Sequence, residues 1–403
     1  MDRAEEISRW LVRNRREGRV DQAGVLGAVK SVHRFLPNFS LSFYAYIRKR
    51  VEIFADSPGY AVVTGQTVQM QMYCGMVMYA SNGYFLLCVQ PDCTAEVVKL
   101  DFSELADYTV YSGQIIKILG VNPIGEEVVV DSVVYDKVLD LVMKPEKETQ
   151  FTVAVINAKK AMNEEILQNS GIKVHKENAL DSGKKQLDSE AVLELVRKST
   201  SDVVIVFGDI PVEEREMYKE MCSTKKIRIV CVPAHDGIES TMAYPTEYLN
   251  RASHTAVPSV TDAQAVREIY EISGSLFVEV QNPSMISMNG VLIALSSIDV
   301  LLGISRKEIS RNRKTRMLDI ITHSVYQSTF LPFVPSDVPV DYSVSSAFIW
   351  PYSPDLYIFP TLLSANMEEV CGTYAVPLNR TEIELSVHCT VDGTVSVETV
   401  RSK

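Results

Sequence analysis

Apolar and polar residues recur along this chain in two different periods, and the change of period divides it into regions. Between residues 3 and 34 charged and apolar residues interleave at helical spacing, with Gly18 as a break between two short helices. A second helical stretch covers residues 43–54 and ends at a DSPG turn signal, residues 56–59. Residues 1–58 are therefore predicted to form a helical N-terminal segment.

From about residue 59 the pattern changes to short runs with strand character, separated by turn residues such as Asn82-Gly83. The five runs cover residues 68–80, 84–90, 95–100, 114–121 and 127–135. One helix-like stretch, residues 101–108, lies among them. Five short strands with one helical insertion are typical of a small barrel of the oligonucleotide/oligosaccharide-binding (OB) kind. We therefore predict an OB-fold domain over residues 59–143.

Beyond a polar linker at 144–150, buried strand-like runs alternate with amphipathic helical patterns. Strands are expected at 151–157, 202–209, 227–236, 274–280, 291–297 and 354–360, helices at 189–199 and 316–327, and a final hairpin around Asp392-Gly393. Strands and helices in this order indicate a layered α/β domain over residues 144–403. The predicted fold class is thus α/β plus β.

Composition narrows the function classes. The 403 residues include 40 Lys and Arg against 51 Asp and Glu, a net charge of −11, which disfavours indiscriminate binding to a phosphate backbone. The first ten residues lack the apolar stretch of a signal peptide, and polar residues interrupt the most apolar window, 288–302. The seven cysteines are irregularly spaced without a C-x-x-C pair. We expect an intracellular protein with reduced thiols and no membrane segment.

Three predicted strand ends resemble a degraded dinuclear metallophosphoesterase site, which needs D-x-H, G-D-x-x-D and G-N-H-[DE] to hold two metal ions. The first strand ends Asn157-Ala158-Lys159, the second continues from Gly208-Asp209 to Val212, and the third ends His235-Asp236 without the Asn. An amine such as Lys159 would repel the ions at short range. The degenerate positions are Asn157, Lys159, Asp209, Val212, His235 and Asp236. We predict an inactivated scaffold without catalytic residues, metal or cofactor.

Two other features, a His-Asp pair and a basic run, each allow a functional and a structural interpretation. His235-Asp236 suits a general-base pair or, more commonly, a polar turn at a strand end. A basic run suits a phosphate or acidic-partner contact or, more commonly, a solvated loop. It consists of Arg306, Lys307, Arg311, Arg313, Lys314 and Arg316. Phosphate-loop, dinucleotide-binding, nucleophile-elbow and H-E-x-x-H motifs do not occur in the sequence.

Several stretches resemble one family, the B subunits of eukaryotic DNA polymerase alpha–primase. Residues 97–135 are similar to the family's barrel segment, with Ser112-Gly113-Gln114 at a strand start. NPSMISMNGVLIALSSIDVLLGISRKEIS, residues 282–310, and SPDLYIFPTLLSANMEEVCGTYAVPLNR, residues 353–380, are similar to blocks specific to alpha-type subunits. The resemblance extends from about residue 95 to 385.

This resemblance implies a non-catalytic nuclear protein that binds the zinc-bearing C-terminal domain of the catalytic subunit and, through the complex, both primase subunits. It implies that the protein supports priming of DNA replication and that its own contact with DNA is weak or indirect. Partner-binding residues are expected at Asp101, Leu105, Tyr108, Tyr111, Asn289 and Asp299. Three alternatives stay open: an active metal-dependent phosphoesterase or nuclease, a single-strand-binding module, and a B-type subunit of polymerase delta or epsilon.

Overall fold

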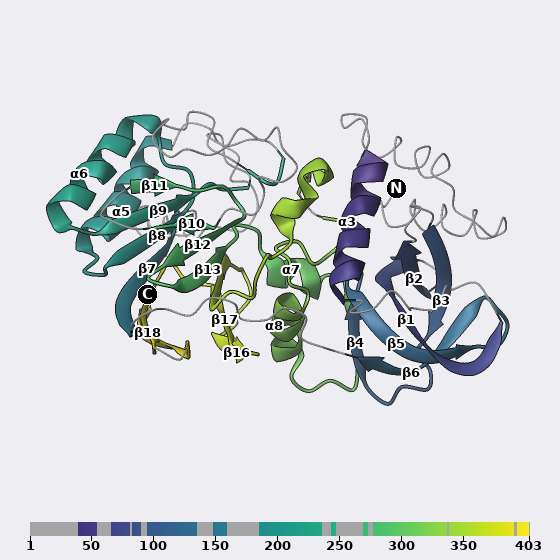
Figure 1. The fold of residues 1–403 in the computed structure, drawn as a ribbon. Coiled ribbons are helices and arrows are strands. Elements are labelled where there is room, and N and C mark those ends of the chain that lie inside the picture. The colour runs from purple at the N-terminus through teal and green to yellow at the C-terminus, as the bar shows by residue number, and fades with distance from the viewer. Residues whose placement is uncertain are drawn as a thin grey trace, which may run out of the picture. The chain divides into compact units, whose positions relative to one another are not determined.

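The computed structural model of this chain describes eleven segments, in two compact units (Figure 1). The described segments are 39–54, 66–80, 83–89, 95–134, 148–158, 185–235, 243–246, 269–272, 277–336, 338–390 and 393–402. The barrel unit holds the described residues up to 134 together with 300–351, and the layered unit holds the remainder. The helices predicted between residues 3 and 34 lie outside the described residues. Segment 300–351 therefore departs from the predicted single domain 144–403.

The barrel unit is built on a closed five-stranded barrel, in the order β1-β2-β3-β6-β5. Its strands are β1 (Thr67–Ala80), β2 (Gly83–Val89), β3 (Ala95–Asp101), β5 (Ile115–Asn122) and β6 (Glu127–Val134). All pairs are antiparallel except β3 with β6. The five strands predicted from the sequence are confirmed, and the coarse class of a mixed α/β plus β fold with them.

Period-two alternation explains how β1 serves two cores. Tyr73 and Val77 belong to the cluster that fills the barrel, whereas Met76 and Met78 belong to a second cluster on the other side of the strand. Helix α3 (Phe39–Phe54) contributes Tyr44, Ile47 and Phe54 to that second cluster. The barrel wall is therefore buried on both faces where α3 covers it.

The prediction of a helix at 101–108 is wrong. The Asp101 carboxylate accepts a hydrogen bond from the Ser103 N–H at 2.9 Å, and the Leu105 N–H donates to the Phe102 carbonyl at 3.2 Å, which makes turns. Strand β4 (Tyr108–Tyr111) follows and pairs antiparallel with β14 (Glu308–Arg311). The acidic turn thus leads into a short strand that holds a distant part of the sequence.

Two buried polar side chains explain why residues 300–351 belong to the barrel unit. The Gln327 side chain accepts from the Ile115 N–H at 2.8 Å and donates to the Ile115 carbonyl at 2.9 Å, as a neighbouring strand would. Arg50 of α3 donates to the Gly113 carbonyl and to the Gln327 side chain, at 2.9 and 2.5 Å. The segment contains α7 (Val300–Ser305), β14, α8 (Arg316–Tyr326) and the 3-10 helix η3 (Tyr342–Phe348).

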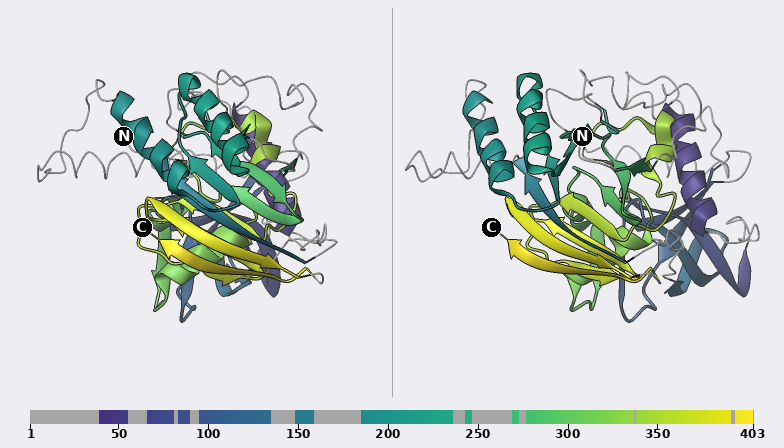
Figure 2. Two further views of the ribbon diagram at one scale, coloured as in Figure 1. Left: turned by 90° about the vertical axis from the view of Figure 1, so that its left-hand side faces the viewer. Right: turned by 60° about the vertical axis from the view of Figure 1, so that its left-hand side comes forward.

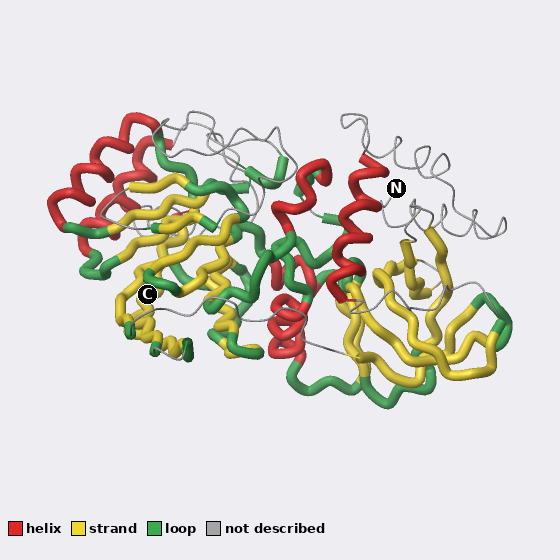
Figure 3. Tube along the Cα trace, viewed as in Figure 1, coloured by secondary structure: helices red, strands yellow, loops and turns green. Residues whose placement is uncertain are grey.

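The layered unit contains two six-stranded sheets (Figures 2 and 3). One, in the order β11-β9-β8-β7-β18-β19, comprises β11 (Phe277–Glu279), β9 (Arg228–Val232), β8 (Val203–Phe207), β7 (Thr149–Asn157), β18 (Glu382–Cys389) and β19 (Val395–Ser402). The other, in the order β10-β12-β13-β15-β17-β16, comprises β10 (Tyr270–Glu271), β12 (Ser284–Met288), β13 (Val291–Leu295), β15 (Leu356–Pro360), β17 (Thr373–Leu378) and β16 (Glu368–Val370).

One apolar cluster joins the two sheets and a second joins the first sheet to its helices. The larger cluster draws Val153, Ile205 and Val230 from the first sheet and Ile293 and Ile358 from the other, all fully buried. Helices α5 (Lys185–Lys198) and α6 (Arg215–Lys225) pack on the other face of β7, β8 and β9 (Figure 2). The predicted strands in this region and the C-terminal hairpin are confirmed, whereas α6, β12 and β17 were not predicted.

Two further expectations, on membrane segments and on cysteines, concern the described residues. None of the described helices is long and apolar enough to cross a membrane. The six described cysteines are free thiols, and Cys371 alone among them is exposed.

Candidate functional site

The carboxyl ends of β7, β8 and β9 bring together three of the residues that the sequence predicted for a degenerate metal site. The three strands are parallel neighbours, with Asn157 opposite Phe207 and Phe207 opposite Val232. Asp209 lies two residues after the end of β8, and its carboxylate accepts a hydrogen bond from the Ala234 N–H at 3.3 Å. Asn157, Asp209 and His235 therefore follow adjacent strand ends, where α/β proteins commonly place reactive groups.

A network of hydrogen bonds occupies the polar groups beside this edge. The His235 Nδ1 donates to the Ser297 carbonyl at 3.0 Å, because a carbonyl oxygen only accepts. Asn282 is fully buried; its amide donates to the Ser297 hydroxyl at 2.6 Å and to the Thr246 hydroxyl at 2.9 Å, and its oxygen accepts from the Ser297 N–H at 2.9 Å. The edge is thus held by side chains that satisfy one another.

These residues do not fit a dinuclear metal centre. Val212, in the 3-10 helix η1 (Val212–Glu214), offers no ligand atom at the position of a carboxylate, and Lys159 and Asp236 lie outside the described residues. Within the described part of the chain no three His, Cys, Asp or Glu side chains are grouped closely enough to hold a metal ion. Asp209 and His235 alone supply too few ligands for two ions.

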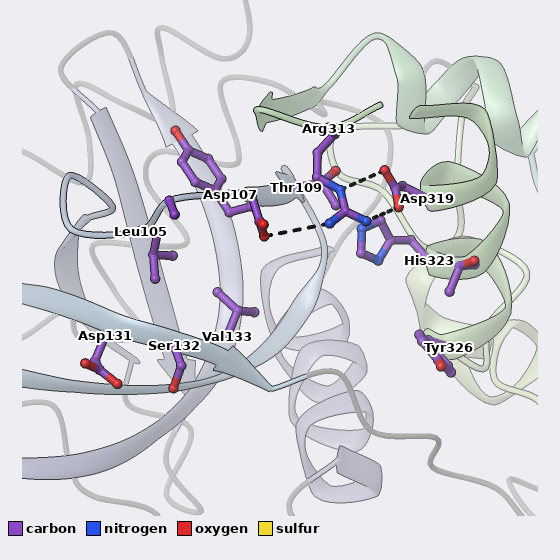
Figure 4. Close-up of a pocket in the computed structure, with 13 residues that line it drawn as sticks. Leu105, Asp107, Thr109, Asp131, Ser132, Val133, Arg313, Asp319, His323 and Tyr326 are labelled. Carbon is purple, nitrogen blue, oxygen red and sulfur yellow. Dashed lines mark hydrogen bonds and ion pairs between the residues drawn. The ribbon is translucent and has the colours of Figure 1, made fainter. Parts of the chain in front are cut away.

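The barrel unit contains a separate feature, a cavity of about 530 Å³ between the barrel and α8 (Figure 4). Its walls come from the β3–β4 turn and β4, from β6, and from α8 with the loop before it. The lining residues are Leu105, Ala106, Asp107, Tyr108, Thr109, Asp131, Ser132, Val133, Arg313, Asp319, Thr322, His323 and Tyr326. We call it the α8 pocket.

Carboxylates outnumber cations around the α8 pocket. Asp319 binds Arg313 through two hydrogen bonds, one of them at 2.9 Å from Nε, and Asp107 lies 3.7 Å from the same guanidinium. Figure 4 shows Arg313 between these two carboxylates, and Asp131 on the barrel strand at the other side. No described residue forms an ion pair with the exposed Asp131. The lining therefore carries three carboxylates and one cation.

His323 adds no positive charge to this wall near neutral pH. Burial lowers its pKa to about 4, since the favourable charge of Asp319 is outweighed by the loss of water. Its Nδ1 pairs with the Gln114 amide at 3.1 Å, and that amide is the donor when the imidazole is neutral. The net charge of the lining at pH 7 is accordingly negative.

Among the residues predicted to bind a partner, two line the α8 pocket. Leu105 is nearly buried, and Tyr108 stacks on Phe102 with ring centroids 4.9 Å apart. Tyr111 is buried at 1% exposure, and Asp101 makes the turn described above.

The other two predicted partner-binding residues lie in the layered unit and have local roles there. Asn289 has a φ of +51° and forms, with Gly290, the two-residue turn between β12 and β13. The Asp299 carboxylate accepts from the Leu362 N–H at 2.7 Å. Their positions serve the local backbone.

The basic run is largely used inside the barrel unit, so its interpretation as a solvated loop was incomplete. Arg311 donates to the Ser103 and Leu105 carbonyls at 3.1 and 3.2 Å. Arg316 pairs with Glu308 at 2.5 Å, and Lys307 lies 5.0 Å from the Phe333 ring centroid. Sequence reasoning missed Asp131, Asp319 and His323, because their segments come together through long-range contacts, among them the pairing of β4 with β14 and the hydrogen bonds of Gln327 to Ile115.

A family model and three curated relatives that are similar to this chain all describe B subunits of DNA polymerases. A model of the family of B subunits of DNA polymerase alpha/epsilon matches residues 210–367. The B subunit of DNA polymerase alpha from Bos taurus is 23% identical over 288 residues, 66% of this chain and 43% of that protein. The Rattus norvegicus protein of the same description is 24% identical over 68% of this chain and 45% of its own length, and the Mus musculus protein 22% over 69% and 46%.

This chain thus spans less than half the length of the curated relatives it matches. Among solved structures, a Vps29 single mutant from Entamoeba histolytica is 11% identical over 62% of this chain and 99% of that one, with a TM-score of 0.24, too low to bear on the fold. The resemblance predicted from the sequence is confirmed by the curated relatives and the family model: over about two thirds of its length, this chain is similar to the B subunits of DNA polymerase alpha.

Proposed function

We propose that this chain is a non-catalytic accessory component of a DNA polymerase alpha–primase complex and that it acts in the nucleus. In this role it binds the zinc-bearing C-terminal domain of the catalytic subunit and, through the complex, both primase subunits. The observation that carries the proposal is the similarity to curated alpha-type B subunits over 66–69% of the chain. The partners and the priming role are inferred from that similarity.

The strand order of the barrel supports its assignment as an OB fold. A meander of three strands followed by two strands that close the barrel, β1-β2-β3-β6-β5, is the arrangement expected of that class. The two sheets of the layered unit, with α5 and α6 outside one of them, support a phosphoesterase-like architecture that has lost its chemistry. The replacement of ligands by Asn157 and Val212 supports the same interpretation.

Rigid surfaces support a binding role on physical grounds. Obligate interfaces commonly bury about 2,000–5,000 Å² and bind best when little ordering is needed on association. Both units have cores of buried apolar side chains, so their surfaces are formed before a partner arrives. The net charge of −11 favours encounter with basic partners.

Affinity purification of the tagged chain from its source cell tests the proposal. Mass spectrometry of the purified complex is expected to identify the alpha catalytic subunit and both primase subunits in near-equal amounts, after washing at moderate salt. Recovery of a delta or epsilon catalytic subunit in their place would reassign the chain to another polymerase. Recovery of none of these proteins would overturn the proposal.

Enzymatic and nucleic-acid alternatives need their own measurements. Purified chain is incubated with manganese and a single-stranded oligonucleotide or a phosphodiester substrate, beside an Asp209→Ala variant as the matched control. Hydrolysis that disappears in the variant would defeat the accessory proposal. Tight oligonucleotide binding that weakens steeply with salt would favour a single-strand-binding module. We expect no turnover and only weak binding.

A further inference from the structure

We propose that the α8 pocket is a socket for an arginine or lysine side chain carried by a protein partner. The inference deepens the proposed function and relies on it only for the partner's identity, since the chemistry of the pocket is independent of that name. Three observations carry it: the volume of the cavity, the excess of carboxylates in its lining, and the apolar surface between them.

The volume suits a side chain with some of its backbone. A cavity of about 530 Å³ lies within the size range of ligand-binding clefts, about 300–1,000 Å³. Its walls belong to β4, β6 and α8, and the pairing of β4 with β14 joins the segment that carries α8 to the barrel. The space is therefore bounded by regular elements on both sides, and a partner does not need to order it.

The charge of the pocket selects a cation. Arg313 is already bound by Asp319 and Asp107, so the positive charge of the wall is neutralised internally. Asp131 brings a further carboxylate to the lining, and the described residues supply no ion pair to it. An incoming guanidinium or ammonium group completes this balance, whereas an anion would be repelled by three carboxylates.

The apolar surface selects a long side chain rather than a small ion. Leu105 and Val133 of the barrel and Tyr326 of α8 line the same cavity as the carboxylates. Arg and Lys pack their methylene stems against apolar surface while the charged head reaches a polar group, and a tyrosine ring also attracts a cation across its face. A hydrated divalent cation would gain nothing from these walls.

Photo-crosslinking in the intact complex identifies the occupant. The photoreactive residue p-benzoylphenylalanine replaces Thr322, which lines the pocket from α8, and cross-linked peptides are sequenced from irradiated cells. The expected result is a segment of a partner protein with an Arg or Lys close to the cross-linked position. The absence of any cross-link, or a segment without a basic residue, overturns the inference.

Charge variants of the full chain then measure the contribution of Asp131. Capture of the purified partner is expected to weaken about tenfold with Asp131→Asn and about 100-fold with Asp131→Lys, because a desolvated charge pair is lost and then reversed. Glu398→Lys, an exposed charge change on β19, is the matched control and should stay within about twofold, as rim charges away from an interface do. Replacing the cross-linked basic residue by Glu should restore capture by Asp131→Lys.

The outcomes separate this inference from the proposed function. If the wild-type chain and Asp131→Lys capture the alpha catalytic subunit equally well, the inference fails and the proposed function stands. If the cross-linked basic segment belongs to a protein outside the polymerase complex, the socket stands, and the affinity purification decides the proposed function separately. A folding defect is recognised by thermal unfolding of each variant beside Glu398→Lys.

Discussion

The strand-end edge of the layered unit and the α8 pocket of the barrel unit differ in whether their polar side chains have partners among the described residues. At the edge, His235 and Asn282 form hydrogen bonds with Ser297, and Asn282 also with Thr246. In the pocket, Asp131 faces a cavity without an ion pair from any described residue. Satisfied polar groups stabilise a fold, whereas an uncompensated charge beside a cavity is available to a ligand.

This difference between the edge and the pocket shows why a fold alone does not identify a functional site. At the position where the sequence predicted a degenerate metal centre, the polar groups bind one another and hold the local structure together. The pocket lies in a unit whose strands carry no recognisable catalytic motif. Function follows from the chemistry of a site, and the groups around the α8 pocket favour binding over catalysis.

The largest loss of stability is expected at Gly113, where the segment that carries α8 packs against the barrel. Gly113 has a φ of +99°, and a Cβ added there would lie 2.2 Å from the Val334 backbone nitrogen. Gly113→Ala should lower the free energy of unfolding by at least about 3 kcal/mol, through backbone strain and a steric clash. Chemical denaturation followed by tyrosine fluorescence measures this change.

Gly125→Ala is the matched control for backbone strain alone. Gly125 has a φ of +79°, but the nearest atom to an added Cβ is 3.7 Å away. Its cost should be about 1 kcal/mol, the penalty for a left-handed conformation. Equal effects of the two substitutions would show that Gly113 matters only for its dihedral angle and that the contact with Val334 is loose.

The second effect tests whether the edge of the layered unit is truly structural. Asn282→Ala removes three hydrogen bonds and leaves the Ser297 N–H and the Thr246 hydroxyl in a buried site, which should cost about 3 kcal/mol. Asn289→Gly, at the exposed turn, should change stability by less than about 0.5 kcal/mol, because glycine adopts positive φ freely. A loss below about 1 kcal/mol for Asn282→Ala would mean that the network is not a structural element.

The two units should also respond to pH in opposite directions. Burial lowers the pKa of His323 to about 4, so the unfolded state binds more protons and stability is lost as the pH falls from 6.5 through 4. Burial raises the pKa of Asp355 to about 6, despite the hydrogen bond from the Leu292 N–H, so stability is lost as the pH rises from 3.8 through 6.

Variants that cannot titrate isolate these contributions. His323→Asn and Asp355→Asn each keep an oxygen acceptor, for the Gln114 amide and the Leu292 N–H respectively. Relative to the wild type, each should remove a change on the order of 2 kcal/mol across its window, measured by denaturation at pH 4 to 7. Difference curves that slope in the same direction for both variants would contradict the assignment.

The pattern of apolar residues along the sequence predicted the strands whose position depends on neighbouring residues alone. Apolar alternation placed the barrel strands and the interior strands of the layered unit, because burial of one or both faces imposes that period. It failed at 101–108, where Asp101 and Glu104 fit helical spacing but the Asp101 carboxylate caps a turn. The Asn289-Gly290 pair carried a hairpin signal that would have predicted β12.

The pocket had no comparable signal. Asp131 and Asp319 lie far apart in the sequence, and each looks like an ordinary solvated acid within its own segment. They line one cavity only because β4 pairs with β14 and Gln327 bonds to Ile115. Such long-range pairings depend on the tertiary structure as a whole, and the patterns within short stretches of one sequence do not predict them.

The smallest expected effect is the most informative about the pocket. Asp131→Asn should change the free energy of unfolding by less than about 0.5 kcal/mol, because the side chain is exposed and has no ion pair with a described residue. Any change should be a slight gain at low salt, since one of three neighbouring carboxylates is removed, and should vanish at high salt. A loss above about 1.5 kcal/mol in denaturation would show that Asp131 already serves the fold, as Asn282 does. Unchanged stability together with weakened partner capture would show that this carboxylate serves binding and not folding. The same separation is not possible at the strand-end edge, where removal of Asn282 is expected to destabilise the fold.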